Sequence, residues 1–320
     1  MSTTTTPAST TRPGPPEGFL ERGPCPLCGG VEFVPHVEFR DLPVRRCKAC
    51  GFIHPAFAMG PEAIARYYRD VFHSPWHRRG QELNSYINIR ALRRMPMLAG
   101  VRSFLDVGTG YGFLLKRLGE RGIEATGVEP SLAEAHWGRD QLGVKVIDRV
   151  LEQSGLPESS FDAVGCFEVI EHTPDPKGFV ALLSRFVKPG GLLIVNTDNF
   201  EAKAVRRLGP EFPKWIPHSH ICDFAPATLE RCVTSVPGLT IAARQSYTAW
   251  ELLLRGAIKS LRAPKPAAEC FSLSGELERE MKRKYRHWGL RLTLAHAGFT
   301  LTRRDDLEGS MMYVVARKAG

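Results

Sequence analysis

The sequence lacks any long hydrophobic run. Although 43% of its 320 residues are apolar, no stretch reaches the roughly 18 consecutive apolar residues of a membrane-spanning helix. The first residues, MSTTTTPASTTRPGPPEG, contain no apolar core of the kind that a secretory signal has. They are rich in Thr, Ser and Pro, so we expect residues 1–18 to form a disordered tail. These absences predict a cytoplasmic protein that does not associate with membranes.

The sequence also lacks a continuous basic arm, although its net charge is +9. Such a charge could attract an anionic partner, either a small molecule or a nucleic acid. The basic residues are spread over several segments, which is typical of solvated helix faces. We therefore expect a small-molecule partner, which could be anionic, before a nucleic acid.

Four of the eight cysteines form two close pairs, Cys25-Pro-Leu-Cys28 and Cys47-Lys-Ala-Cys50. This spacing is typical of a zinc site, and the glycines after each pair allow the tight turns that point two thiolates at one metal. Four thiolates leave no open position, so the predicted zinc is structural. It would hold together a zinc-ribbon-like module over residues 19–58. The alternative is a pair of disulfides, which a reducing compartment disfavours.

The remaining cysteines, Cys166, Cys222, Cys232 and Cys270, show no metal spacing and are expected to be packing residues. His54 follows the second cysteine pair, but four thiolates already complete the metal shell. We expect His54 to lie on the surface.

A glycine-rich turn is the most informative segment of the chain. An apolar stretch ending at Val107 reads as a buried strand, and it is followed by Gly108-Thr109-Gly110-Tyr111-Gly112 and an apolar helix. The third glycine comes one position too early for a dinucleotide fingerprint, and Asp106 would repel a diphosphate. About twenty residues on, Glu129 is placed as a carboxylate that binds ribose hydroxyls. The pattern favours S-adenosylmethionine, which has an adenosine and a sulfonium but no phosphate. A nucleotide-binding turn of another kind is the alternative.

The rest of the chain alternates strand and helix signals. This alternation predicts an α/β fold with a doubly wound, mostly parallel seven-stranded sheet. The expected strands are 102–107, 124–129, 144–148, 161–167, 191–197, 239–245 and 310–317. Residues 59–98 are expected to form a helical lid or linker, and residues 99–320 the core domain. A helical cap insertion at about 247–296, with helices at 250–261 and 274–294, would cover the acceptor site or form a homodimer contact.

Four motifs in order resemble the class I S-adenosylmethionine-dependent methyltransferases. They are LDVGTGYG (105–112), GVEPS (127–131), FDAVGCFEVIEHTPDP (161–176) and VKPGGLLIVNTDN (187–199). In the last motif a helix is expected to end at Lys188-Pro189-Gly190-Gly191, because Pro and Gly do not continue a helix. The resemblance covers about residues 99–318 and implies the Rossmann-like fold of that family.

The resemblance also implies roles for individual residues. The turn with Gly108, Thr109, Gly110, Tyr111 and Gly112 would cradle the methionine part of the cofactor, with Asp106 facing its ammonium group. We expect Val150 and Leu151 at the adenine, with Asp148 as the competitor, and Phe167 and Glu168 beside the transferred methyl. His220 and His172 stand where family members often carry histidines. Either could be the general base, and His172 could instead bind a loop backbone. The helical stretch 59–98 could be a lid or could simply dock onto the core.

The resemblance thus implies a methyltransferase that acts on a small molecule, with oxygen in a sugar, polysaccharide or natural-product intermediate as the favoured acceptor. A zinc-bearing RNA methyltransferase is the alternative, although the end of the fourth strand, Cys166-Phe167-Glu168-Val169, lacks the Asn-Pro-Pro-Tyr motif of amino-group methylation. A sugar C-methyltransferase or a non-catalytic cofactor-binding module are further alternatives.

Overall fold

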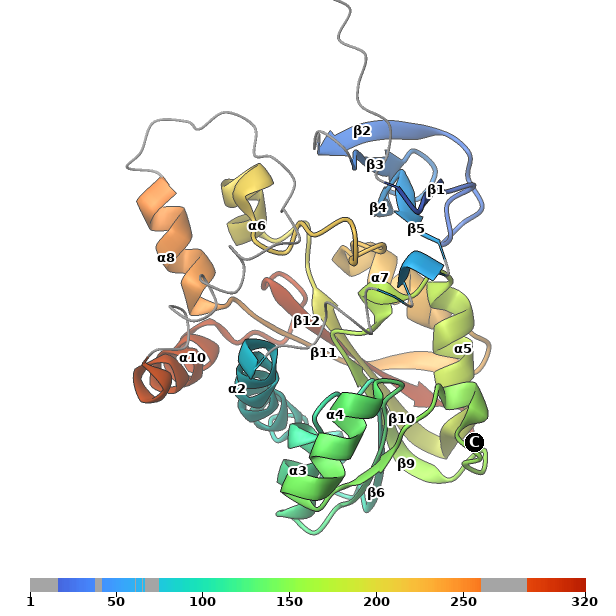
Figure 1. Ribbon diagram of the computed structural model, residues 1–320, viewed down its shortest axis with the longest axis vertical. Helices are drawn as coiled ribbons and strands as arrows, with labels where there is room; N and C mark the ends of the chain where they lie inside the picture. The colour runs from blue at the N-terminus through green and yellow to red at the C-terminus, as the bar shows by residue number, and fades with distance from the viewer. Residues whose placement is uncertain (1–16, 38–41, 61, 65, 67–74, 260–286) are drawn as a thin grey trace, which may run out of the picture.

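A seven-stranded sheet lies at the centre of the computed structural model, which describes residues 17–37, 42–60, 62–64, 66, 75–259 and 287–320 (Figure 1). The strand order is β11-β12-β10-β9-β6-β7-β8. The strands are β6 (Ser103–Val107), β7 (Glu124–Val128), β8 (Lys145–Ile147), β9 (Phe161–Phe167), β10 (Val187–Asp198), β11 (Leu239–Tyr247) and β12 (Met311–Lys318). β12 pairs antiparallel with both β10 and β11, and the other strand pairs of this sheet are parallel. The predicted α/β fold with a mostly parallel seven-stranded sheet is confirmed.

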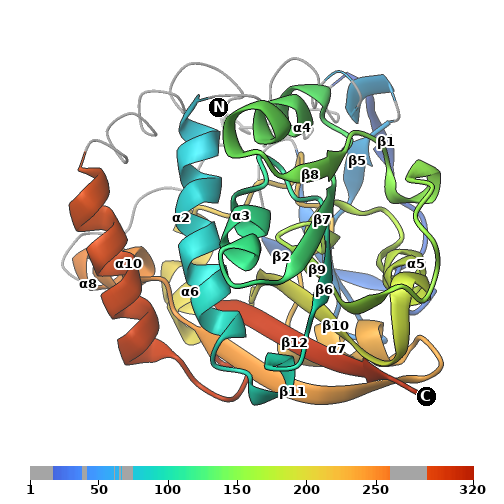
Figure 2. The ribbon, with the colours of Figure 1, turned by 90° about the horizontal axis from the view of Figure 1, so that it is seen from below.

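The sheet is covered by helices on both faces because successive side chains of a buried strand point to opposite sides. In β6, Phe104 packs in one apolar cluster with α2 (Pro75–Leu92), α3 (Phe113–Gly119) and α10 (Trp288–Thr302). The next residue, Leu105, packs in another cluster with α5 (Pro176–Phe186) and α7 (Pro226–Thr234). Figure 2 shows these two groups of helices on opposite sides of the sheet.

The remaining elements of the core are short. They are the helices α4 (Leu132–Trp137), α6 (Lys203–Leu208) and α8 (Trp250–Lys259), and the helical turns η1 (Pro96–Leu98), η2 (Gly138–Leu142), η3 (Leu151–Gln153), η4 (Ile170–His172) and η5 (Gly209–Glu211). None of the helices in the described part of the chain is long and apolar enough to cross a membrane.

Two expected boundaries differ from the structure. Helix α5 ends at Phe186, and Lys188 to Gly191 belong to β10, where the register with β9 shifts between Val187 and Leu192. The segment therefore bulges within the strand rather than ending the helix, and Gly190 takes the left-handed φ of 74° that such a bulge needs. Helix α10 continues to Thr302, beyond the expected end at Leu294, because Phe299 packs into the core.

The N-terminal part forms a small β module against the end of the sheet (Figure 1). It contains a two-stranded sheet, β1 (Phe19–Glu21) with β5 (Phe57–Met59), and a three-stranded sheet, β2 (Phe33–Val37), β3 (Val44–Cys47) and β4 (Ile53–Pro55). His54 is fully buried in this module, with its ring edge-on to Phe33. The expectation of a surface histidine was wrong, because the module packs against the core and encloses it.

Several expectations concern residues outside the described ranges. The residues concerned are 1–16 of the expected tail, 67–74 of the expected lid, and 260–286 of the expected cap insertion, which include Cys270.

Candidate active site

The glycine-rich turn follows β6 at the carboxyl end of the sheet. Gly108, Gly110 and Gly112 all adopt left-handed φ values, 74°, 56° and 77°. A Cβ on Gly108 would lie 2.5 Å from a methyl of Val169, and one on Gly110 would lie 2.1 Å from Oε1 of Gln81. The turn therefore excludes side chains at these positions on both conformational and steric grounds. Its backbone N–H groups are bound within the protein, with Gly108 and Thr109 donating to the carbonyl of Val128.

Glu129 follows β7 and is buried beside this turn. Its Oε2 accepts a hydrogen bond from the backbone N–H of Gly110 at 2.9 Å, and its Oε1 accepts one from Ser131 at 2.8 Å. Burial, with a contribution from nearby Glu134, raises the pKa of Glu129 to about 7. A carboxylate oxygen can accept more than one hydrogen bond, so Glu129 can bind the turn and still accept from a ligand hydroxyl.

Asp106 is buried at the end of β6. Its Oδ2 accepts a hydrogen bond from the hydroxyl of Thr109 at 2.7 Å. Burial raises the pKa of Asp106 to about 7, and Thr109 lowers it only in part. A cationic group placed beside this carboxyl would favour its ionised form.

Helix α2 lies over the turn through Gln81, a residue that the sequence did not single out. Gln81 Oε1 accepts a hydrogen bond from the backbone N–H of Tyr111 at 3.0 Å. Its Nε2 donates to Glu134 at 3.3 Å. Tyr111 is itself buried, with its ring edge-on to Trp137 at 5.3 Å. No motif marks Gln81, and only its place in the expected lid or linker pointed to this region.

Glu168 stands at the end of β9 with a left-handed φ of 56°, unusual for a residue with a side chain. Its two oxygens accept hydrogen bonds from Asn84 of α2 and from Lys214, the latter at 2.5 Å. Burial opposes ionisation of Glu168, but the charge of Lys214 outweighs it and holds the pKa below its usual value. Asn84 and Lys214 were not found from the sequence, because neither lies in a recognisable motif.

Two further carboxyls lie next to Glu168. The side-chain oxygens of Glu168, Glu171 and Asp198 fall within 4.8 Å of one another. Glu171 Oε2 accepts a hydrogen bond from Thr197 at 3.0 Å, and Lys214 Nζ lies 3.4 Å from Asp198. Burial raises the pKa of Glu171 to about 8 and that of Asp198 to about 6. Both residues stand in the motifs at 161–176 and 187–199, so those motifs were the signal that could have found them.

The two candidate histidines meet at this acidic cluster. Their rings pack edge to face with centroids 4.8 Å apart, and Glu171 lies within 4.8 Å of a nitrogen of each. His172 Nδ1 lies 2.9 Å from the carbonyl oxygen of Ser219, which fixes the proton on Nδ1 and leaves Nε2 as an acceptor. Nδ1 of His220 is buried and has no hydrogen-bond partner among the described residues.

Burial lowers the pKa of His172 to about 4 and that of His220 well below its usual value. Both rings are therefore neutral near pH 7 and can accept a proton. Glu171, His172 and His220 together also form a donor set that a divalent cation could use.

The other expected cofactor residues differ in exposure. Leu151 is buried in η3, whereas Val150 is 41% exposed. Phe167 ends β9 and lies against Gly165, and it is partly buried. Asp148, the competitor for the adenine position, is paired with Arg139 at 3.0 Å and with His136 at 3.4 Å. The hydrogen bond from Arg139 lowers the pKa of Asp148.

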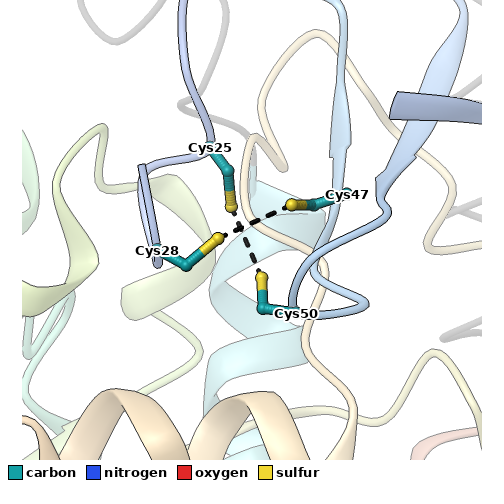
Figure 3. Close-up of side chains that lie close together, drawn as sticks. All are labelled: Cys25, Cys28, Cys47 and Cys50. Atoms are coloured by element: carbon teal, nitrogen blue, oxygen red, sulfur yellow. Dashed lines mark hydrogen bonds between the residues drawn. The ribbon is translucent and has the colours of Figure 1, made fainter. Parts of the chain in front are cut away.

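The four cysteines of the module converge on a common centre (Figure 3). Their sulfurs lie within 4.8 Å of one another, with Cys25 and Cys50 3.6 Å apart and Cys28 and Cys47 also 3.6 Å apart. A tetrahedron with zinc–sulfur bonds of about 2.3 Å has sulfur–sulfur edges of about 3.8 Å, so the spacing suits such a metal. All four are free thiols at distances far beyond a disulfide bond of about 2.05 Å.

The cysteine pairs sit on two equivalent turns. Gly29 N–H donates to the carbonyl of Cys25 at 2.8 Å, and Gly51 N–H donates to that of Cys47 at 2.9 Å. Both glycines adopt left-handed φ values, 74° and 76°. The expected role of these glycines in shaping the turns agrees with this geometry.

A family model described as a methyltransferase domain matches residues 75–240. The chain belongs to this family. The glycine turn, Glu129 and strands β6 to β10 lie within the matched segment.

Curated relatives share part of this methyltransferase. The chain is 36% identical over 140 residues to the ubiquinone biosynthesis O-methyltransferase of Pseudomonas entomophila. The aligned segment covers 40% of this chain and 60% of that protein. The chain is 39% identical over 109 residues to the protein of the same name from Alkalilimnicola ehrlichii, covering 32% of this chain and 44% of that one. The chain thus spans about half the length of the curated relatives it matches.

Among solved structures, the methyltransferase is similar to a chain in the complex of the Haloferax volcanii Trm112 methyltransferase activator with a methyltransferase. The TM-score is 0.51 at 19% sequence identity, over 79% of this chain and 98% of that chain. This likeness concerns the fold.

Proposed function

We propose that this protein transfers a methyl group from S-adenosylmethionine to an oxygen of a small-molecule acceptor, an intermediate of sugar, polysaccharide or natural-product metabolism. The observation that carries the proposal is the neutral His172–His220 pair beside Glu171, at the carboxyl ends of the strands that carry the glycine turn. The relatives named O-methyltransferases support oxygen as the methylated atom.

The cofactor fits the residues around the turn. The turn keeps a left-handed backbone without side chains at its three glycines, and among the described residues only Thr109 contributes to the pKa of the buried Asp106 carboxyl besides burial. An ammonium group of the cofactor would supply a cation there, and ribose hydroxyls would donate to Glu129. When bound, the cofactor supplies a methyl group already activated by the sulfonium.

The chain's own contribution is then alignment and proton removal. The hydroxyl of the acceptor would donate to Nδ1 of His220, whose ring donates in turn to the backbone of Lys214. Alignment of two reactants in a site is worth about 7–11 kcal/mol, and a positioned base adds about 10²–10⁴-fold in rate. Most of the catalysis would therefore come from holding the acceptor oxygen in line with the methyl group.

The charge of the site favours a neutral, hydroxyl-bearing acceptor. Glu171 lies beside both histidines, Glu168 and Asp198 lie beside Glu171, and Lys214 contacts Glu168 and Asp198. An anionic acceptor would meet like charges, whereas hydroxyl groups would find several acceptors. This acidic surrounding also argues against RNA, whose phosphates would be repelled.

The test is turnover of methyl-labelled cofactor against hydroxylated metabolites, catechol-type phenols and total RNA, with the parent and the His220→Gln variant. We expect label in a small molecule, as a methyl ether, and at least a hundredfold lower kcat for the variant. Label in RNA, or on a carbon or nitrogen atom, would overturn the proposal. So would full activity of the variant.

We also propose that Cys25, Cys28, Cys47 and Cys50 hold a structural zinc ion. Zinc would need no further ligand there, so the site would stabilise the module and take no part in proton transfer. Metal analysis of the purified protein, with the Cys47→Ser variant beside it, tests this proposal. Loss of bound zinc in the variant is the expected result.

A further inference from the structure

The cysteine module shares its core with the segment that carries His220. Cys25, Leu27, Cys47 and Phe52 belong to the same apolar cluster as Ile221, Cys222 and Phe224. The rings of Phe52 and Phe224 pack edge to face with centroids 5.2 Å apart. The module is therefore continuous with the methyltransferase core at this segment.

Hydrogen bonds reinforce this packing immediately after His220. Arg22 of the module donates to the carbonyl of Ile221. The backbone N–H of Asp223 donates to the carbonyl of Ile53 at 2.9 Å, where β4 and the segment form an isolated antiparallel bridge. Backbone pairing of this kind fixes the register of the segment against the module.

On its other side, the same segment is tied to the acidic cluster. The N–H groups of Ile221 and Cys222 donate to the carbonyl of Glu171 at 2.8 and 3.0 Å. The carbonyl of Ser219 binds Nδ1 of His172. The segment 219–224 is thus held between the module and the loop with Glu171 and His172, and a shift on the module side would move both histidine rings.

We propose that the cysteine module positions the acceptor side of the active site, with Arg22 and Phe52 acting through the segment 219–224 on His220 and His172. The inference rests on the proposed function, in which His220 faces the acceptor. The module's contacts described above run to residues after β10, whereas the glycine turn and Glu129 follow β6 and β7. Acceptor turnover therefore depends on the module, and cofactor binding does not.

The test compares Arg22→Met and Phe52→Leu with the control Lys48→Met. Lys48 lies in the same module and pairs with Glu32 within it, at 3.1 Å. For each variant, calorimetry measures the binding of S-adenosylhomocysteine, and zinc content and acceptor kinetics are determined on the same protein. Amide exchange is followed at Ile221 and Asp223, and NMR reports on labelled histidine rings.

In Arg22→Met and Phe52→Leu we expect unchanged zinc content, a Kd for S-adenosylhomocysteine within about twofold of the parent, faster exchange in 221–223, and shifted ring signals of His220 and His172. Misplacement of a reacting group by about 1 Å can cost about 10²-fold, so kcat should fall about tenfold to a hundredfold. Lys48→Met should match the parent in every measurement.

The inference is overturned if both variants keep the parent's ring signals and exchange rates, or if they lose cofactor affinity together with turnover. The NMR and exchange measurements need no acceptor, so they separate this inference from the proposed function. If His220→Gln is fully active but Arg22→Met shifts the rings, the proposed base is wrong and the positioning contact stands.

Discussion

Gln81 and Asn84 lie one turn apart on α2 and contact the two halves of the active site. Gln81 accepts a hydrogen bond from Tyr111 in the glycine turn, and Asn84 donates to Glu168 at the end of β9. Residues three apart share a helix face, so one helix fixes both the glycine turn, where we propose that the cofactor binds, and Glu168, on the proposed acceptor side. A shift of α2 along its axis would disturb the two sides together.

Substitution of these two residues should separate their effects. Gln81→Ala removes a bond to the turn, and a net hydrogen bond is worth about 0.5–1.5 kcal/mol, so the Kd for S-adenosylhomocysteine should rise about twofold to tenfold. Asn84→Ala should leave that Kd unchanged and lower kcat. Calorimetry and turnover measure the two effects, with Arg79→Ala as a control on the same helix, where Arg79 pairs with Glu82. Equal effects of both variants on the Kd would contradict this division.

Asp106 should make the ligand-free protein less stable as pH rises. Burial raises its pKa to about 7 in the folded state, so between pH 4 and pH 7 the folded protein binds more protons than the unfolded chain. The free energy of unfolding therefore falls over this window. Asp106→Asn removes the carboxyl whose ionisation destabilises the fold, so the variant should be more stable than the parent at pH 8, by on the order of a few kcal/mol.

Urea unfolding at pH 5 and pH 8 measures this effect. The stability gap between Asp106→Asn and the parent should be clearly larger at pH 8 than at pH 5, while the variant binds S-adenosylhomocysteine more weakly. A gap that does not change with pH would show that the carboxyl is ionised without cost in the fold.

The pH dependence of turnover should lack a histidine limb near pH 6.5. Burial lowers the pKa of His172 to about 4 and that of His220 well below its usual value, so a proton blocks the base only under acidic conditions. We expect kcat/KM to be insensitive to histidine protonation between pH 6 and pH 8 and to decline only at more acidic pH. S-adenosylhomocysteine binding at each pH shows whether the protein is still folded. A limb near pH 6.5 that disappears in His220→Gln would contradict the buried, neutral state of the ring.

Zinc removal should act on the module first. Cys47→Ser breaks the four-thiolate set, and a small module gains much of its folding free energy from such a metal. We expect lower zinc content and a lower Tm in this variant. Cys232→Ser also loses a buried thiol, in α7, and should keep the zinc of the parent. Elemental analysis and calorimetry measure both quantities, and equal zinc in the two variants would rule out the cysteine site.

The strands and the cofactor turn could be predicted because their signals are local. Several core strands contain a short apolar run, such as Leu192 to Val195 in β10, and the spacing of Gly108, Gly110 and Gly112 is visible in the sequence itself. Glu129 followed from its place directly after a strand, and Asp106 from its place at the end of the strand before the glycines. The structure brings both next to the glycine turn, which is the arrangement that the parallel strands impose.

The contacts made by distant segments could not be predicted. Lys214 reaches Glu168 from a loop 46 positions away, and no local pattern marks it. His54 was expected at the surface because the sequence does not show which face of the module packs on the core. The bulge of Lys188 to Gly191 depends on the pairing of β10 with β9, and Pro and Gly alone equally suggest the end of a helix.

The left-handed backbone at Glu168 has a consequence for attempts to stabilise this enzyme. An L-residue in that conformation is disfavoured by about 1–2 kcal/mol, so glycine would suit the backbone better there. Glu168→Gly would relieve this backbone cost, but it would also remove the carboxylate that Asn84 and Lys214 contact. Loss of a buried partner of a lysine costs about 3–5 kcal/mol, so the contacts of the Glu168 side chain outweigh the strain and glycine would not stabilise the protein at this position.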